Sequence, residues 1–443
     1  MENHRILSSL VENRRMTSAL HLEFWHSGGV DAEHYELSAV YATDYADPHL
    51  KGSLDHRGSY RWVLRDAGGA LIASRGYSAL FEEWQSTVVG KAGHFVERMP
   101  ETHVVPWVKG SRLCMERRSA AGFVPIMELQ LPSNASTLPQ SSDRRVKDLH
   151  GCRGLCVLFV AEGYTEEEES RFDAHAASAC ELLLATEPFA TLGSHVQFKS
   201  LFAPSQIAGI PSFPGAPGTR YGTAYGTLGM ARYLVCHNQH ALRQDVAGVR
   251  WDTLVVLANS DVYGGSGIFN SCACVAVDMG PADMGYVLPH ELGHSLGGLG
   301  DEYFGKEVTY AIDGEDAWLA WEPNISALDP DNQVKWSDRL GASVVIPTPW
   351  QHESYSRAMR EVVDPVANKE HVASLLAAEP ALGTLGVFEG ARYRARGMYR
   401  PEVDCRMFSK TAGRFCSICM RTLEEAILSA GKSVATLGSR GPV

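Results

Sequence analysis

Two uninterrupted apolar runs constrain the fold of this chain more than any other feature of its sequence. GLCVLFVAEGY occupies residues 154–164, and DTLVVLAN occupies residues 252–259. A strand without polar alternation must be buried on both faces, as in a mostly parallel sheet that helices cover on each side. TEEEESRFDAHAASACELLLA at 165–185 agrees, because its apolar spacing is helical, its first turn is acidic and Thr165 is a suitable N-cap.

The chain from about residue 150 onwards is therefore predicted to be an α/β layer. Its further predicted elements are a strand at 195–203, a helix at 226–246, an edge strand at 267–278 and a helix at 415–431. Gly431 is expected to end the last of these helices. Residues 303–390 are irregular in composition and predict loops and short helices.

Residues 1–140 have a different pattern. Short segments rich in Val, Tyr, Trp and Phe alternate with Gly, Pro and Asp, which is typical of an antiparallel β-sandwich. The Ser-, Pro- and Asn-rich stretch 131–143 predicts a linker. A length of 443 residues also favours two domains, here a β-sandwich at 1–140 and a mixed-sheet domain at 150–443. We expect Trp84 to pack in the sandwich and Glu82 and Glu83 to lie on its surface.

The charge balance excludes some classes of partner. The net charge of -12 argues against nucleic acid or an anionic membrane surface, since both require a basic face. No apolar run approaches the roughly 20 residues that span a bilayer. Residues 1–16 contain no apolar signal-peptide core, so we predict no signal peptide in this chain and assign no compartment or oligomeric state.

The run VLPHELGHSLGGLGDEY at 287–303 carries the chemistry. His290 and His294 are four residues apart, so a helix places both imidazoles on one face, where they can bind one zinc ion. Glu291 projects beside them and can take a proton from a water molecule and return it to a leaving amine. Burying these groups without a metal would be costly. The pattern therefore predicts a catalytic zinc site.

A catalytic zinc site needs a third protein ligand. Gly297 and Gly300 let the chain leave the helix and turn back towards the metal. Asp301 is the favoured third ligand, with Glu302 orienting a neighbouring group. The opposite assignment of these two carboxylates stays open.

HELGHSLGGLGDEY resembles the zinc-binding run of the IgA peptidase family of zinc metallopeptidases. Other stretches are similar to that family: VAEGYTEEE at 160–168, LVVLANSDVYGGSG at 254–267, MYRPEVDCRM at 398–407, FCSIC at 415–419 and, ahead of the peptidase domain, SRGYSALFEEWQST at 74–87. The resemblance implies a zinc-dependent endopeptidase that acts on proteins or peptides. It also implies a mostly secreted group of relatives, while IgA itself does not follow as the substrate.

The wider similarity is to the metzincins, whose motif is His-Glu-x-x-His-x-x-Gly-x-x-His/Asp. His290 to Gly297 match this motif in place, whereas Gly300 occupies the position of the third ligand and Asp301 follows one residue later. The resemblance implies a zincin-type domain with an active-site helix and a methionine turn beneath the metal. Met407 is the candidate for that turn, and a core methionine is the alternative.

Tyr399 is the predicted stabiliser of the tetrahedral oxyanion, with Arg400 beside it. The alternative is a structural turn with Pro401. The predicted edge strand at 267–278 offers free backbone groups that can pair with an extended peptide.

Cys405, Cys416 and Cys419 lie near one another in sequence. Cys416-x-x-Cys419 has no second Cys-x-x-Cys partner, so we do not expect a structural metal site. A disulfide from Cys405 to one of the other two and free thiols are both left open. Nothing in the sequence indicates calcium.

Two other functions use the same sequence features. One is a zinc amidase or deacylase acting on a non-protein or cell-wall bond through the same metal chemistry. The other is a non-catalytic binding protein that keeps the fold. The intact Glu291 argues against the second of these.

Overall fold

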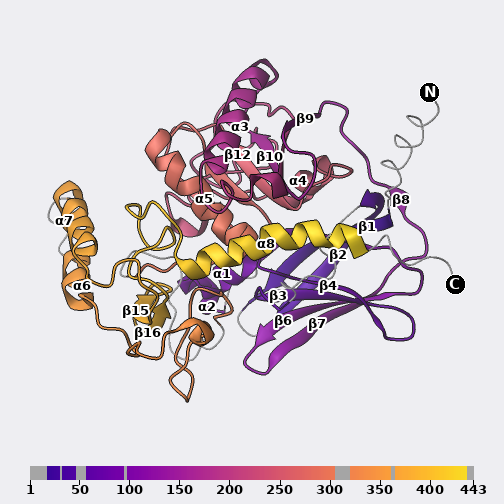
Figure 1. The fold of residues 1–443 in the computed structure, drawn as a ribbon. Coiled ribbons are helices and arrows are strands. Elements are labelled where there is room, and N and C mark those ends of the chain that lie inside the picture. The colour runs from indigo at the N-terminus through magenta and orange to yellow at the C-terminus, as the bar shows by residue number, and fades with distance from the viewer. Residues whose placement is uncertain are drawn as a thin grey trace, which may run out of the picture.

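The computed structural model describes residues 17–29, 32–45, 56–93, 97–304, 320–360 and 365–436 (Figure 1). Residues 1–16, where the sequence predicts no signal peptide, lie outside this part, as do 305–319 and 361–364 of the stretch expected to be irregular. No helix within the described ranges combines the length and the apolarity needed to cross a bilayer.

The N-terminal part consists of two four-stranded sheets. The first has the order β5-β1-β2-β8, from β1 (Thr17–Gly28), β2 (Glu33–Tyr45), β5 (Glu97–Pro106) and β8 (Ser136–Thr137). The second has the order β4-β3-β6-β7, from β3 (Tyr60–Arg65), β4 (Leu71–Tyr77), β6 (Arg112–Ser119) and β7 (Gly122–Gln130). Phe24 of the first sheet and Trp62 of the second belong to one apolar core, so the two sheets share their inner faces. The short helices α1 (Leu80–Ser86) and α2 (Val88–Lys91) follow β4.

The predicted linker at 131–143 is bound to the sheets rather than free. Its β8 pairs in parallel with β2, and the Leu138 amide donates to the Ala42 carbonyl at 2.9 Å. The next strand, β9 (Arg145–His150), already belongs to the following sheet.

The third sheet has six strands in the order β13-β14-β12-β10-β11-β9. Its other members are β10 (Leu155–Glu162), β11 (Val196–Phe202), β12 (Thr253–Ala258), β13 (Gly265–Gly267) and β14 (Ala273–Ala276). Every residue of β10 is buried. Val157 and Phe159 face one apolar core, whereas Leu158 and Val160 face another, which explains the uninterrupted apolar run.

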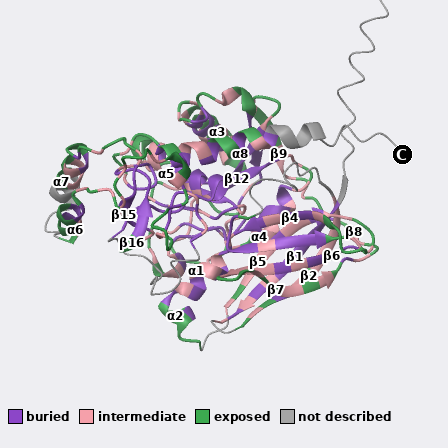
Figure 2. Ribbon diagram, turned by 60° about the horizontal axis from the view of Figure 1, so that its bottom comes forward, coloured by how far each residue is buried: buried purple, intermediate pink, exposed green. Residues whose placement is uncertain are grey.

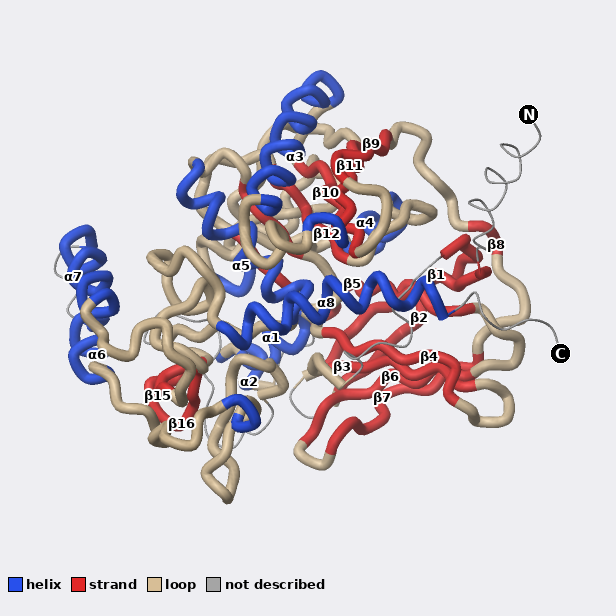
Figure 3. The backbone as a smooth tube through the Cα atoms, viewed as in Figure 1, coloured by secondary structure: helices blue, strands red, loops and turns tan. Residues whose placement is uncertain are grey.

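Helices cover both faces of this central sheet (Figures 1 and 3). On one face lie α3 (Glu169–Leu184), α5 (Pro281–Gly297) and α8 (Ser417–Thr436), which share an apolar core with the sheet. On the other face lies α4 (Gln239–Asp245). The hairpin of β15 (Phe388–Ala391) and β16 (Arg394–Arg400), with α6 (His352–Arg360) and α7 (Pro365–Ala377), extends to one end of the molecule, as Figure 2 shows.

The helix predicted at 226–246 is mostly wrong. Gly226, Leu228 and Gly229 have φ of 76°, 54° and 81°, in the left-handed region that an α-helix excludes. Val235 then pairs with Ala224 in an isolated bridge. Only the last turns of the expected helix form, as α4.

Two other boundaries differ from the sequence prediction. The segment 267–278 is not one edge strand, because β13 forms the edge and β14 lies inside the sheet, between β13 and β12. Helix α8 continues through Gly431 to Thr436, so this glycine does not end it.

The edge strand β13 packs closely on α5 because it contains glycines. A Cβ atom on Gly267 would lie 2.2 Å from the Glu291 carbonyl oxygen and 2.7 Å from the His294 Cβ. Gly265 likewise faces the Glu291 side chain, with Oε1 2.8 Å from where its Cβ would be. The glycines therefore set the distance between the sheet edge and the helix.

Gly267→Ala is expected to lower the free energy of unfolding by about 1–3 kcal/mol, because the added methyl group overpacks this contact. Denaturant titration measures the change. Gly413→Ala is the matched control, since no heavy atom lies within 4 Å of its would-be Cβ. Equal unfolding midpoints for the two variants would contradict the close packing of β13 on α5.

Candidate metal centre

Helix α5 carries His290, Glu291 and His294 and contains a proline just before them. Pro289 has no N–H to donate to the Gly285 carbonyl one turn earlier. The Arg406 Nη1 atom donates to that carbonyl at 2.6 Å instead. Beyond the histidines, Gly298 with φ of 62° ends the helix in the left-handed conformation. Both features fix the helix around the two imidazoles.

The two histidines and Asp301 present three ligand atoms to one point. The Nε2 atoms of His290 and His294 are 3.2 Å apart. The Asp301 Oδ1 atom lies 3.3 Å from the first and 3.4 Å from the second. Two ligands about 2.0–2.1 Å from a tetrahedral zinc ion are themselves about 3.3 Å apart. The triangle therefore fits a single zinc-sized ion.

Backbone carbonyls orient both imidazoles. His290 Nδ1 donates to the Arg406 carbonyl at 3.0 Å, and His294 Nδ1 donates to the Leu299 carbonyl at 2.5 Å. In the neutral form that binds metal, such a bond keeps the ring proton on Nδ1 and leaves the Nε2 lone pair free for the ion.

Asp301, rather than Glu302, lies with the histidines. Its Oδ2 accepts a hydrogen bond from the Tyr393 hydroxyl, while its buried Oδ1 has no hydrogen-bond partner. The Glu302 side chain faces away from the histidines, and Asn324 Nδ2 donates to its Oε1 at 2.9 Å. An orphaned, buried carboxylate oxygen beside two imidazoles is the arrangement that a cation would satisfy.

Tyr393 is held in place by a tight turn. Arg392 and Tyr393 join β15 to β16 and have φ of 48° and 65°. Two consecutive residues at positive φ are typical of a type I′ hairpin turn, where non-glycine residues are strained by about 1–3 kcal/mol each. The Tyr393 amide donates to the Tyr303 carbonyl at 2.9 Å, which ties the turn to the segment after α5.

A cavity of about 510 Å³ opens onto the three ligands and Glu291. Burial raises the pKa of Glu291, and the charges of His290 and His294 partly oppose this rise. A carboxylate with a raised pKa is suited to exchange protons near neutral pH.

The N-terminal part supplies one wall of this cavity, through residues that include Glu82 and Glu83. The expectation that this acidic pair lies on an outer surface is therefore wrong, whereas Trp84 packs in the core as predicted. Burial raises the pKa of Glu83 to about 7, and the Tyr233 hydroxyl donates to its carboxylate. The family-like stretch 74–87 contains both glutamates, but it did not predict this role, because the role depends on how the two parts of the chain dock.

Tyr399 is not brought to the site. It is absent from the cavity lining, which contains other tyrosines such as Tyr263 and Tyr286. Its backbone pairs with Ser326, and its ring is buried in the apolar core. Arg400 is also buried and donates to backbone carbonyls, Gly390 among them, so its role here is structural.

Met407 lies beneath the helix, with its Sδ 3.1 Å from where a Cβ on Gly293 would be. The sheet edge is less open than expected. Gly265 of β13 is bridged to Tyr233, and Ser266 Oγ donates to the Leu234 carbonyl at 2.5 Å. Extended substrate therefore cannot add a full strand along β13.

A family model described as IgA Peptidase M64 matches residues 148–427, most of the chain. The chain belongs to this family. The family expected from the resemblance is thereby confirmed, and membership indicates a metallopeptidase. The match does not reach residues 74–87, so the similarity seen there stays a prediction. No curated protein matches the chain.

Zinc binding to the metal-free protein is expected to release a proton from His294. Burial alone would lower the pKa of this imidazole, but the adjacent Asp301 carboxylate raises it to about 9. The ring is therefore charged at neutral pH and must become neutral to bind metal, so zinc affinity should rise with pH up to about 9. Calorimetry in two buffers of different ionisation enthalpy measures this proton, and a binding heat independent of the buffer would contradict it.

Tyr393→Phe is expected to weaken zinc binding about 10- to 100-fold, because the Asp301 carboxylate loses the hydroxyl that orients it. Competition with a chelator of known affinity measures the change. Tyr355→Phe removes another buried phenol outside the cavity and is the matched control. Equal affinities in the two variants would show that Tyr393 does not position the ligand.

Proposed function

We propose that this member of the family is a zinc-dependent endopeptidase. In this proposal His290, His294 and Asp301 hold the zinc ion, and Glu291 is the general base and then the general acid. The triangle of two Nε2 atoms and an orphaned Oδ1, with edges of 3.2 to 3.4 Å, carries the proposal. Its donor set of two imidazoles and one carboxylate is one that catalytic zinc ions use.

The proposed architecture follows from the same residues. We assign residues 1–140 to a β-sandwich accessory domain and residues 150–443 to a zincin-type catalytic domain with metzincin-like features. The helix motif, the Asp301 ligand displaced by one residue and Met407 beneath Gly293 support the second assignment. The cavity wall that Glu82 and Glu83 contribute supports a role for the first domain in binding substrate.

The bound zinc ion supplies Lewis acidity, which acidifies water and polarises the scissile carbonyl. Glu291, half-buried at the cavity wall, accepts the proton of the attacking water and later delivers it to the leaving amine. The Asp301 carboxylate, held by Tyr393, fixes the ligand geometry against movement during the reaction.

We assign oxyanion stabilisation to Tyr263 and Arg232 rather than to Tyr399. Both residues line the cavity. Each is also close enough to Glu291 for a charge effect: the Glu291 carboxylate adds to the rise in the pKa of Tyr263, and the Arg232 guanidinium opposes part of the rise in the pKa of Glu291. Burial and the Glu291 carboxylate raise the pKa of Tyr263, so its hydroxyl keeps its proton and can donate to developing negative charge.

Glu291→Gln is expected to lower kcat for peptide hydrolysis about 100- to 10,000-fold, because the amide cannot accept the proton of water. Zinc content and the unfolding midpoint should not change. Fluorogenic peptides and an unfolded protein substrate measure turnover.

Glu424→Gln makes the same change at an exposed position of α8 and is the matched control. Wild-type turnover in the Glu291 variant would overturn the assigned base. Hydrolysis confined to N-acyl or peptidoglycan amides would overturn the endopeptidase proposal and favour the amidase alternative.

A further inference from the structure

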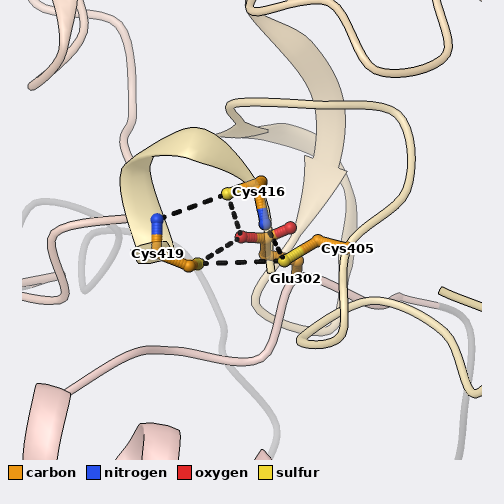
Figure 4. Close-up of side chains that lie close together, drawn as sticks. All are labelled: Glu302, Cys405, Cys416 and Cys419. Carbon is orange, nitrogen blue, oxygen red and sulfur yellow. Dashed lines mark hydrogen bonds between the residues drawn. The ribbon is translucent and has the colours of Figure 1, made fainter. Parts of the chain in front are cut away.

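Four fully buried side chains converge beside the candidate catalytic site, on the side away from its cavity. They are Glu302, Cys405, Cys416 and Cys419, drawn in Figure 4 and called the Cys/Glu cluster below. They come from three segments: the chain after α5, the turn after β16 and the beginning of α8. None of the four lines the catalytic cavity.

The distances within the Cys/Glu cluster match a tetrahedral metal site. The Sγ atoms of Cys405 and Cys419 are 3.9 Å apart. Glu302 Oε1 lies 3.2 Å from Cys419 Sγ and 3.6 Å from Cys416 Sγ. Around a tetrahedral zinc ion, two sulfurs at about 2.3 Å are about 3.8 Å apart, and a sulfur and an oxygen are about 3.5 Å apart.

The surroundings of two of the three sulfurs suit thiolates. Backbone amides of Met407 and Cys416 donate to Cys405 Sγ at 3.4 and 3.1 Å, and the Cys419 amide donates to Cys416 Sγ at 3.4 Å. Hydrogen bonds from backbone N–H groups favour the charged form of the sulfur they contact, as around metal-bound cysteines.

The carboxylate gives an independent observation. Glu302 is fully buried, and its Oε2 has no hydrogen-bond partner. Burying a carboxylate among thiols without a cation costs several kcal/mol. The buried Arg400 guanidinium is near enough to act on Glu302, but it donates to the backbone carbonyls of Glu389, Gly390 and Val403 instead.

A disulfide, one of the two states left open by the sequence, is not formed by these cysteines. If two of the three sulfurs were joined at about 2.05 Å, the third thiol and the Glu302 carboxylate could not share one central ion with them. The sequence predicted no structural metal here because it contains no second Cys-x-x-Cys pair. The remaining ligands are instead one cysteine and one glutamate.

We propose that the Cys/Glu cluster binds a second zinc ion with a structural role. Three thiolates and one carboxylate fill all four positions, and a closed set of this kind distinguishes structural from catalytic zinc. The Cys416-x-x-Cys419 spacing is one that structural zinc sites use.

This ion joins the segments that position the catalytic ligands. Glu302 follows the proposed ligand Asp301 directly, and its amide donates to the Met407 carbonyl at 2.8 Å. Cys405 precedes Arg406, whose carbonyl orients His290. The second zinc ion therefore fixes Asp301 and the Arg406 carbonyl, which orients His290, relative to each other.

The test counts zinc in the purified full-length protein, prepared with added zinc under reducing conditions. Elemental analysis should find two zinc ions per chain in the wild type and one in the double variant His290→Ala/His294→Ala. X-ray absorption at the zinc edge of that double variant should show sulfur neighbours at about 2.3 Å. Because the double variant lacks two of the three proposed catalytic ligands, the result does not depend on the proposed peptidase function.

Cys416→Ser should lower the zinc content of the double variant from one ion to none, whereas Cys180→Ser, at another buried cysteine, should leave it at one. If Cys416→Ser does not fold, the absorption spectrum of the double variant still decides. A metal-free double variant would overturn the proposal. So would zinc with only nitrogen and oxygen neighbours, or a disulfide within the Cys/Glu cluster by mass spectrometry.

Discussion

The site depends on a reciprocal contact between helix α5 and the turn that contains Arg406. The Arg406 side chain donates to the Gly285 carbonyl that Pro289 leaves unpaired, and the Arg406 carbonyl accepts from His290 Nδ1. One residue thus repairs the helix at its proline and orients the first imidazole. Buried polar groups are costly when unpaired, so each half of this contact stabilises the other.

The two parts of the chain meet at the same helix. Arg57, buried at the docking face of the N-terminal part, donates to the Gly297 carbonyl at the end of α5 with a distance of 3.1 Å. Asn270 Nδ2 donates to the Gly76 carbonyl at 2.6 Å, and the Ser78 amide donates to the Phe269 carbonyl. These bonds connect strand β4 to the segment beyond β13, so they place Glu82 and Glu83 over the cavity. The acidic wall is therefore part of the same packing as the candidate metal ligands.

Local patterns predicted what local geometry determines. The i, i+4 spacing of His290 and His294 specifies one helix face whatever the rest of the chain does. The uninterrupted apolar run of β10 likewise predicted a strand buried on both faces, because that burial follows from the pattern of the segment itself. The sequence favoured Asp301 as the third ligand but left Glu302 open, because adjacent side chains point to opposite sides and the backbone direction depends on contacts with Arg392 and Met407.

Partners distant in sequence left no pattern to find. Tyr393 lies 92 residues from Asp301 and reaches it only through the strained hairpin turn. The failed helix at 226–246 has a different cause, since its apolar spacing was helical but left-handed backbone at Gly226 and Leu228 interrupts it. Apolar periodicity reports which side chains are buried, and it does not report the φ that a buried loop adopts.

Asp301 and Glu302 couple the two sides of the site through one stretch of backbone. The Asp301 carbonyl accepts from the Arg392 amide at 2.9 Å, and the Glu302 amide donates to the Met407 carbonyl. These two hydrogen bonds hold the backbone at Asp301 and Glu302. The Asp301 carboxylate then points to the imidazoles, and the Glu302 carboxylate points to the thiols. The two side chains therefore depend on the same backbone hydrogen bonds for their directions. The geometry around the candidate metal ligands is then set partly by a buried group that does not line the cavity.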